Sequence, residues 1–311
     1  MGDDLDPFDP EISDLILDFD PITLARRPVA RAQVVEAFRR RNNRRAANIV
    51  ARLPVDDRGD LDPDAVDRLL LAVHSEIQRL SEEFLQGARV KAILAPTLQA
   101  MRDCGLPPPY RVVDVGCGPG FMIRWLAAFG DLGDDVELVG ADYHLALIER
   151  ARRLAQAEGL RCRFEVANAF HLTQPASIFM SIGVIHHFRG PSLGAFLAQQ
   201  DRPEAMAFMH FDIKSSWLAP IGAWIFHVAR MREPLSRHDG VLSAARAHPS
   251  EALVNAARQH APGFKAALFD EDRAPLPILK VMHALVGVRP ALADALVDAL
   301  GPDRHRLEPL S

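Results

Sequence analysis

Hydrophobic residues in the first third of the chain recur with the period of an α-helix. Asp62 and Pro63 form a typical N-cap and first turn. The apolar residues after them alternate spacings of four and three, which places them on one helix face: Val66, Leu70, Val73, Ile77, Leu80 and Phe84. A second apolar face follows over 90–101, and the sequence GLPPPY at 105–110 ends the helical pattern.

From Pro109 on, short β-rich runs alternate with helical ones. The apolar runs predict strands with the sequences RVVDV, VELVGA, RCRFEVA, IFMSIGV, AMAFMHFDI and MHALVGV. Helical periodicity predicts helices at 120–129, 144–157, 191–199, 217–230 and 250–260. Strands that alternate with helices form a mostly parallel sheet covered by helices on both faces, so the pattern predicts a doubly wound α/β fold.

These patterns divide the chain into four segments. We expect a flexible, acidic N-terminus over 1–29 and a helical cap over 30–106. We expect the sheet domain over 107–290, followed by a C-terminal helix and tail over 291–311.

Composition narrows the class of protein. The 311 residues are 49% hydrophobic and 25% charged with a net charge of −5, as expected for a globular chain with a sizeable core. No apolar run reaches the roughly 18 residues of a membrane span, and the acidic N-terminus does not resemble a secretory signal. The three cysteines have no metal-ligand spacing. We therefore expect reduced thiols, no metal site, no membrane partner and a cytoplasmic location.

One basic cluster, RRRNNRRAA at 39–47, stands out from the acidic average. Its arginines can bind RNA phosphates, but we favour a solvated helix face, because basic runs often lie on solvated surfaces. The negative net charge gives no indication of nucleic-acid binding.

The most informative stretch follows the first predicted strand, in the sequence VVDVGCGPG. Gly116, Gly118 and Gly120 follow Asp114 in the pattern Asp-x-Gly-x-Gly-x-Gly. A nucleotide-triphosphate loop needs a lysine, and none occurs in 110–130. A dinucleotide loop needs its third glycine one position later. The loop therefore predicts close approach of the backbone by a ligand that has no phosphate.

This loop resembles the first motif of the class I S-adenosylmethionine-dependent methyltransferases. The resemblance covers roughly 108–290 and implies a Rossmann-like sheet of seven mostly parallel strands, with S-adenosylmethionine as the cofactor. In that family the acid at the position of Asp114 lies near the methionine end of the cofactor. The glycines let the cofactor approach the bare backbone.

Further positions match the family in order along the chain. Asp142 ends the second predicted strand, where a carboxylate can accept hydrogen bonds from both ribose hydroxyls. The resemblance implies that Tyr143 packs on the adenine. Asn168 and Ala169 stand where the family usually has Asp-Ala, and an asparagine can still accept a hydrogen bond from the adenine amino group.

Two histidines follow the fourth predicted strand, in SIGVIHHF. Methyltransferases that act on base amines usually carry Asn/Asp-Pro-Pro-Tyr/Phe here, so His186 and His187 count against a nucleobase acceptor. A histidine can serve as a general base near neutral pH, or it can only cap the strand. Adjacent residues on an extended chain point to opposite sides, so we expect one of the two at the acceptor and favour His187.

Candidate acceptor contacts lie between the last two predicted strands. Trp217 and Trp224 belong to an apolar stretch that can cover a hydrophobic acceptor or form a plain core helix. His238, in the sequence His-Asp-Gly, is expected in a turn or facing the acceptor.

The resemblance implies an enzyme that moves a methyl group to O, N or C of a small, hydrophobic metabolite. A methyltransferase-fold support subunit without catalysis is the alternative, and an RNA methyltransferase guided by the arginine cluster is a third hypothesis. The sequence leaves the oligomeric state open, including a homodimer.

Overall fold

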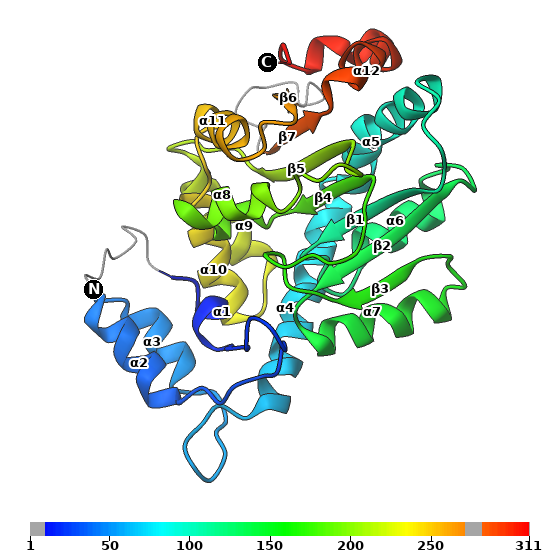
Figure 1. The fold of residues 1–311 in the computed structure, drawn as a ribbon. Coiled ribbons are helices and arrows are strands. Elements are labelled where there is room, and N and C mark those ends of the chain that lie inside the picture. The colour runs from blue at the N-terminus through cyan, green and yellow to red at the C-terminus, as the bar shows by residue number, and fades with distance from the viewer. Residues whose placement is uncertain (1–9, 271–281, 311) are drawn as a thin grey trace. The chain divides into compact units, whose positions relative to one another are not determined.

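Figure 1 shows the computed structural model, which describes residues 10–270 and 282–310. The described chain divides into two compact units. The helical unit contains the residues up to Leu80 together with Ser215–Ala247. The sheet unit contains Ser81–Lys214 together with the residues from His248 on.

The helical unit is built around a small apolar core. Ile12, Phe38, Val50 and Leu70 are buried in it, together with Leu235 from the second segment of the unit. Its helices are α1 (Ile12–Leu15), α2 (Arg31–Arg40), α3 (Arg44–Val50), α4 (Pro63–Glu83), α9 (Ala219–Arg230) and α10 (Pro234–Ala245). Asp62 caps α4 as expected, since its Oδ1 accepts a hydrogen bond from the backbone N–H of Ala65 at 2.7 Å.

The sheet unit contains one seven-stranded sheet with the order β3-β2-β1-β4-β5-β7-β6. Strands β1 to β5 run parallel to their neighbours, and β7 runs antiparallel to both β5 and β6. The strands are β1 (Tyr110–Val115), β2 (Val136–Asp142), β3 (Arg163–Val166), β4 (Ile178–Ile182), β5 (Ala207–Ile213), β6 (Lys265–Asp270) and β7 (Met282–Val288). The predicted doubly wound, mostly parallel sheet is confirmed.

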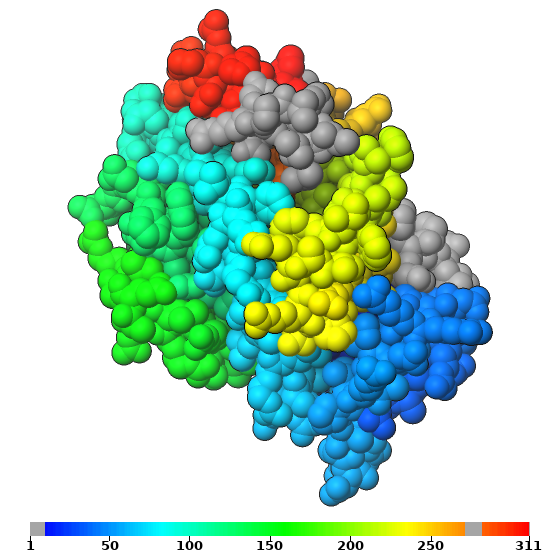
Figure 2. Space-filling view, turned by 180° about the vertical axis from the view of Figure 1, so that it is seen from behind, coloured from blue at the N-terminus to red at the C-terminus, as the bar shows by residue number. Residues whose placement is uncertain are grey.

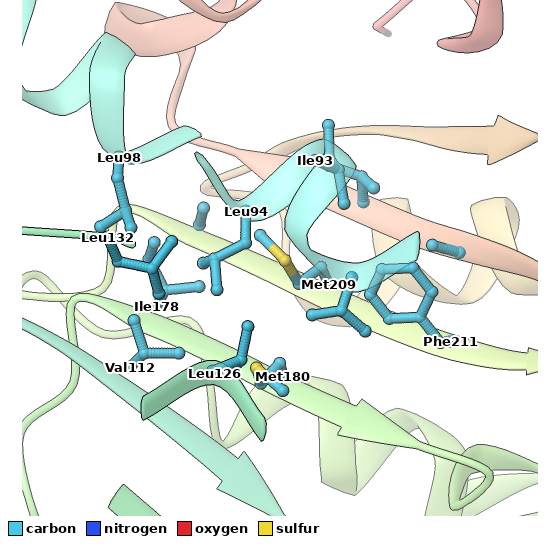
Figure 3. Packing of buried hydrophobic residues seen from close by; sticks show 14 of the residues in the cluster. Ile93, Leu94, Leu98, Val112, Leu126, Leu132, Ile178, Met180, Met209 and Phe211 are labelled. Atoms are coloured by element: carbon cyan, nitrogen blue, oxygen red, sulfur yellow. The ribbon is translucent and has the colours of Figure 1, made fainter. Parts of the chain in front are cut away.

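Helices cover both faces of this sheet. One face packs against α5 (Gln86–Asp103), α6 (Phe121–Phe129), α7 (Leu145–Ala157) and α12 (Ala293–Leu300). The other face packs against α8 (Pro191–Ala198) and α11 (Ser250–His260). Figure 3 shows Ile93 and Leu94 of α5 beside Met209 and Phe211 of β5, packed within the first of these two cores. Burial of both faces is why the strands read as nearly continuous apolar runs.

Three short 3₁₀ turns complete the described chain: η1 (Ile185–His187), η3 (Pro290–Leu292) and η4 (Gly301–Arg306). The last helix and its following turn, coloured red, lie at the surface of the sheet unit in Figure 2. No helix within residues 10–270 and 282–310 is long and apolar enough to cross a membrane.

The acidic N-terminus is built into the helical unit from residue 10 on, rather than extending from it. Ile12 and Ile16 are buried. The carboxylate of Asp239 accepts hydrogen bonds from the backbone N–H groups of Ile12 at 2.9 Å and Ser13 at 3.0 Å. The buried isoleucines and the paired backbone groups offset the conformational entropy that is lost when this segment is ordered. An acidic composition alone gives no such compensation. Residues 1–9 of the expected flexible segment lie outside the described residues.

The boundaries of the two units also differ from those expected at 106 and 290. Helix α5 packs on the sheet and belongs to the sheet unit, whereas 215–247 belongs to the helical unit although it interrupts the sheet sequence. The C-terminal helix α12 packs against α5 inside the sheet unit. Periodicity identifies helices but not the neighbours that they pack against.

Two elements differ from the pattern-based expectation. Strand β6 was not expected. Its sequence KAALFD contains two alanines, which are depleted in strands, and its polar and apolar residues do not alternate. His238, Asp239 and Gly240 lie inside α10 and do not form a turn. A Cβ atom at Gly240 would overlap the ring of His227 on α9, so the glycine permits close packing of two helices.

Candidate functional site

The three glycines of the loop between β1 and α6 all have positive φ angles, of 76° at Gly116, 54° at Gly118 and 76° at Gly120. Other L-residues rarely adopt this conformation. A Cβ atom at Gly116 would lie 2.7 Å from Cγ2 of Val184, and one at Gly120 would overlap the ring of Phe164. The loop therefore needs glycine for its backbone angles and for its packing.

Asp142, the last residue of β2, is bonded to this loop. Its Oδ2 accepts a hydrogen bond from the backbone N–H of Gly118 at 2.9 Å, and its Oδ1 accepts one from His144 at 2.9 Å. Burial raises the pKa of Asp142, although the backbone N–H donors of His144 and Gly118 oppose this shift. Each carboxylate oxygen has a second lone pair, so the group can accept further hydrogen bonds from a ligand.

Asp114 is a second buried acid at the carboxyl end of β1. It is 2% exposed, and its Oδ1 accepts no hydrogen bond from any residue that the structure describes. Burial raises the pKa of Asp114 well above its ordinary value, and the neighbouring charge of Asp142 raises it further. A ligand with positive charge and hydrogen-bond donors would compensate both carboxyl groups. S-adenosylmethionine, which carries an ammonium, a sulfonium and a ribose diol, supplies both the positive charge and the hydrogen-bond donors.

The predicted adenine contacts follow β2 and β3. Tyr143 is 43% exposed, and its ring lies edge-on to the ring of His144. The Oδ1 of Asn168 accepts a hydrogen bond from the backbone N–H of Phe170 at 2.9 Å, which fixes the asparagine in a local turn. Ala169 is half-buried and packs against the core on the α8–α11 face.

His186 is held by a carboxylate that the sequence alone did not indicate. Its Nδ1 lies 2.8 Å from Oδ1 and 3.1 Å from Oδ2 of Asp212, the penultimate residue of β5. The backbone N–H of His186 donates to Oδ2 of the same residue at 2.9 Å. Both side chains are buried. An acidic residue at the carboxyl end of a mostly apolar strand was the available signal.

Burial raises the pKa of Asp212, but the charge of His186 and its hydrogen bonds outweigh burial, and the net shift is downward. His187 is half-buried, and its ring centroid lies 4.3 Å from that of His186, with the ring planes 33° apart. The two rings therefore lie side by side. The expectation of opposite orientations was wrong because the segment is a 3₁₀ turn rather than an extended strand.

The remaining predicted acceptor contacts belong to the helical unit. Trp217 is 81% exposed and Trp224 is 51% exposed. His238 is buried, with Nδ1 2.8 Å from Oδ1 of Asp239 and Nε2 3.0 Å from Nδ2 of Asn43. Both ring nitrogens of His238 thus have partners within its own unit.

The central part of the chain is similar in sequence to known proteins. Residues 112–202 match the family model described as a methyltransferase domain. The demethylmenaquinone methyltransferase of Thermus thermophilus is 33% identical over 81 residues, which are 26% of this chain and 36% of that protein. The chain thus matches about a third of the length of this relative.

Two solved structures are similar over larger parts of the chain. The plantazolicin methyltransferase BpumL, in complex with SAH, covers 72% of this chain and 95% of its own, with 11% identity and a TM-score of 0.49. Magnesium protoporphyrin IX methyltransferase from Synechocystis, with bound SAH, covers 83% of this chain and 99% of its own, with 14% identity and a TM-score of 0.43.

The match over 112–202 spans the glycine loop, Asp142, Asn168 and the histidine turn, in the order expected for this class of domain. Residues 112–202 of the chain therefore match a methyltransferase domain.

Proposed function

We propose that the chain transfers a methyl group from S-adenosylmethionine to a small-molecule acceptor. The observation that carries the proposal is the joint geometry of Asp142 and the loop. The carboxylate of Asp142 accepts a hydrogen bond from the backbone N–H of Gly118. The neighbours of Gly116 and Gly120 leave no room for a side chain at either position. An acid next to bare backbone, with no lysine in the loop, suits a cationic nucleoside without phosphate.

Each residue of the site has a distinct role in this proposal. Asp142 accepts hydrogen bonds from the ribose hydroxyls, and Asp114 compensates the charge of the methionine end, directly or through water. Tyr143 packs on the adenine, while Asn168 and Ala169 border the adenine edge. The cofactor supplies a methyl group that is already activated by the sulfonium, so the protein needs only to align the acceptor and remove its proton.

For the acceptor we propose an apolar small molecule. Trp217, just before α9, and Trp224, within α9, present exposed indoles, and such residues bind apolar ligands well. The matched relative is named for a quinone-type acceptor, which agrees with this class. A cytoplasmic location remains part of the proposal.

The alternative of a support subunit without catalysis predicts the same cofactor site but no methyl transfer. S-adenosylmethionine carrying a labelled methyl group, incubated with the protein and a panel of apolar phenols, quinols and amines, separates the two. We expect label in at least one extractable small molecule. Label in none of them, with cofactor binding intact, favours the support subunit. Label in added RNA would favour the arginine cluster of 39–47 as an acceptor site.

A further inference from the structure

The contact between His186 and Asp212 has the geometry that fixes a histidine tautomer. The carboxylate lies 2.8 Å from Nδ1, and burial of both groups keeps the contact away from water. A carboxylate on one ring nitrogen holds the proton on that nitrogen, which leaves the other nitrogen as a proton acceptor.

Resting on the proposed function, we propose that His186 is the general base for the acceptor and that Asp212 is its positioning residue, so that the acceptor reacts through an ionisable hydroxyl group. This assigns the base to His186, whereas the sequence favoured His187.

Asp212 is itself held rigidly. Its Oδ1 accepts a hydrogen bond from the backbone N–H of Ile213 at 2.7 Å, and its Oδ2 accepts one from the backbone N–H of His186 at 2.9 Å. Strand β5 lies between β4 and β7 in the sheet, and Asp212 is directly opposite His283 of β7. Because the backbone of a central strand hardly moves, the carboxylate can fix both the position and the tautomer of the imidazole.

The dyad also lies next to the cofactor loop. Val184, two residues before His186, packs on the loop at Gly116. A Cβ atom at Gly116 would lie 2.7 Å from Cγ2 of Val184. The backbone N–H of Gly183 donates to the carbonyl of Phe211 at 2.8 Å, which joins this turn to the end of β5. The histidine turn is therefore bounded by the glycine loop on one side and by Asp212 on the other. This is the edge of the sheet where a ligand is expected.

The proposed step balances as follows. The acceptor oxygen attacks the methyl carbon, an O–C bond forms, and the C–S bond breaks with its electron pair moving to sulfur. The hydroxyl proton passes to Nε2 of His186, and the negative charge of Asp212 stabilises the resulting imidazolium. In the structure, the interaction with His186 and the hydrogen bonds that Asp212 accepts outweigh burial and lower the pKa of Asp212.

Other ionisable groups of the sheet unit surround the dyad. His187 stacks beside His186 on the same turn, and Arg189 follows it. His248 of the segment before α11 binds the carbonyls of Ile185 and Phe188, at 3.1 Å and 2.8 Å. Burial lowers the pKa of His248 and of His283, which favours the neutral form of both rings.

The first experiment measures the tautomer and needs no acceptor. Nitrogen-15 histidine labelling and long-range nitrogen–proton correlation, with His186→Gln to assign the signals, report which ring nitrogen carries the proton. We expect a neutral His186 protonated at Nδ1. A neutral His186 protonated at Nε2 would overturn the proposal, whatever the activity of the protein.

The second experiment measures methyl transfer to phenols as a function of pH, with labelled S-adenosylmethionine. We expect Asp212→Asn and His186→Gln each to lower kcat/KM by about 100-fold or more while cofactor affinity by calorimetry stays within about threefold. Asp212→Asn should also move the acidic limb of the rate profile to lower pH, because the imidazolium loses its counter-charge. A purely structural role would not move that limb.

Asp270→Asn is the matched control, because it removes a carboxylate that pairs with Lys214 at 2.8 Å. We expect its kcat/KM to stay within about threefold of wild type. His187→Gln removes the neighbouring imidazole and tests the alternative base. Loss of kcat/KM confined to His187→Gln, or an unchanged rate profile in Asp212→Asn, contradicts the dyad. Absence of cofactor binding by the wild type would instead contradict the proposed function.

Discussion

The ring of Phe164 on β3 occupies the space where a side chain at Gly120 would begin. A Cβ atom there would overlap Cε1 and Cζ of the ring, and it would lie 3.0 Å from the Cβ of Ala151 on α7. The third glycine of the loop is thus fixed by a residue that lies 44 positions further along the chain. The contact holds the start of α6 close to the sheet, where the loop has to present its backbone.

Replacement of this glycine tests the contact. Gly120→Ala combines left-handed strain, which costs about 1–2 kcal/mol, with overlap against Phe164, so we expect a loss of about 3 kcal/mol or more in the free energy of unfolding. Gly159→Ala is the matched control, since φ is 65° there and no atom lies within 4 Å of the added Cβ. Urea unfolding of both variants gives the comparison. Equal losses would mean that Phe164 moves aside without cost.

The loop predicts which nucleotides bind. Isothermal titration calorimetry should give saturable heats with S-adenosylmethionine and with its demethylated product, but not with NAD or ATP. The reason is the arrangement of two buried acids, Asp114 and Asp142, which repel phosphates and stabilise a cation. Saturable NAD binding without a response to either sulfur ligand would rule out this interpretation of the site.

Asp142 should carry a large share of the cofactor affinity. If its carboxylate accepts hydrogen bonds from both ribose hydroxyls, Asp142→Ala weakens the free energy of cofactor binding by roughly 2 to 4 kcal/mol. This corresponds to a dissociation constant about 30-fold to 1000-fold higher. The exposed Asp134, which pairs with Arg161 at the surface, serves as the control, and Asp134→Ala should bind like wild type. A melting curve shows whether the variant keeps its fold. Wild-type affinity in folded Asp142→Ala would remove the residue from the site.

A buried histidine of β5 makes stability depend on pH. Burial lowers the pKa of His210 from 6.5 to about 3. Its neutral ring is paired on both sides, with Ser181 Oγ 2.8 Å from Nδ1 and Gln200 Oε1 2.8 Å from Nε2. Below pH 6.5 the unfolded chain takes up a proton that the folded chain does not, so stability falls by up to about 1.4 kcal/mol per pH unit from this group.

His210→Gln removes the titration and keeps a side chain that forms hydrogen bonds. Urea unfolding at pH 7, 6 and 5 should show a shallower loss of stability on acidification than in wild type, by up to one proton. His305→Gln, at an exposed position in η4, should keep the wild-type slope. Parallel pH curves for His210→Gln and wild type would show that His210 is protonated in the folded state as readily as in the unfolded one.

The sequence by itself determined the features that depend on local chemistry. The Asp-x-Gly-x-Gly-x-Gly spacing required a tight loop with positive φ angles, and all three glycines have them. The apolar runs from Pro109 on were long enough to indicate the parallel sheet, because strands buried on both faces can contain few polar residues. Asp142 could be placed at the end of β2 because a strand ends where its apolar run ends.

Only the tertiary structure decided which distant residues meet. Asp212 and His186 are 26 positions apart, and they meet because β4 and β5 are neighbours in the sheet, so their carboxyl ends share one edge. Asp239 binds Ile12 across 227 positions, which converts an acidic N-terminus into part of a packed unit. Periodicity and spacing describe one segment at a time, whereas the free energy of these contacts depends on both partners and on their burial.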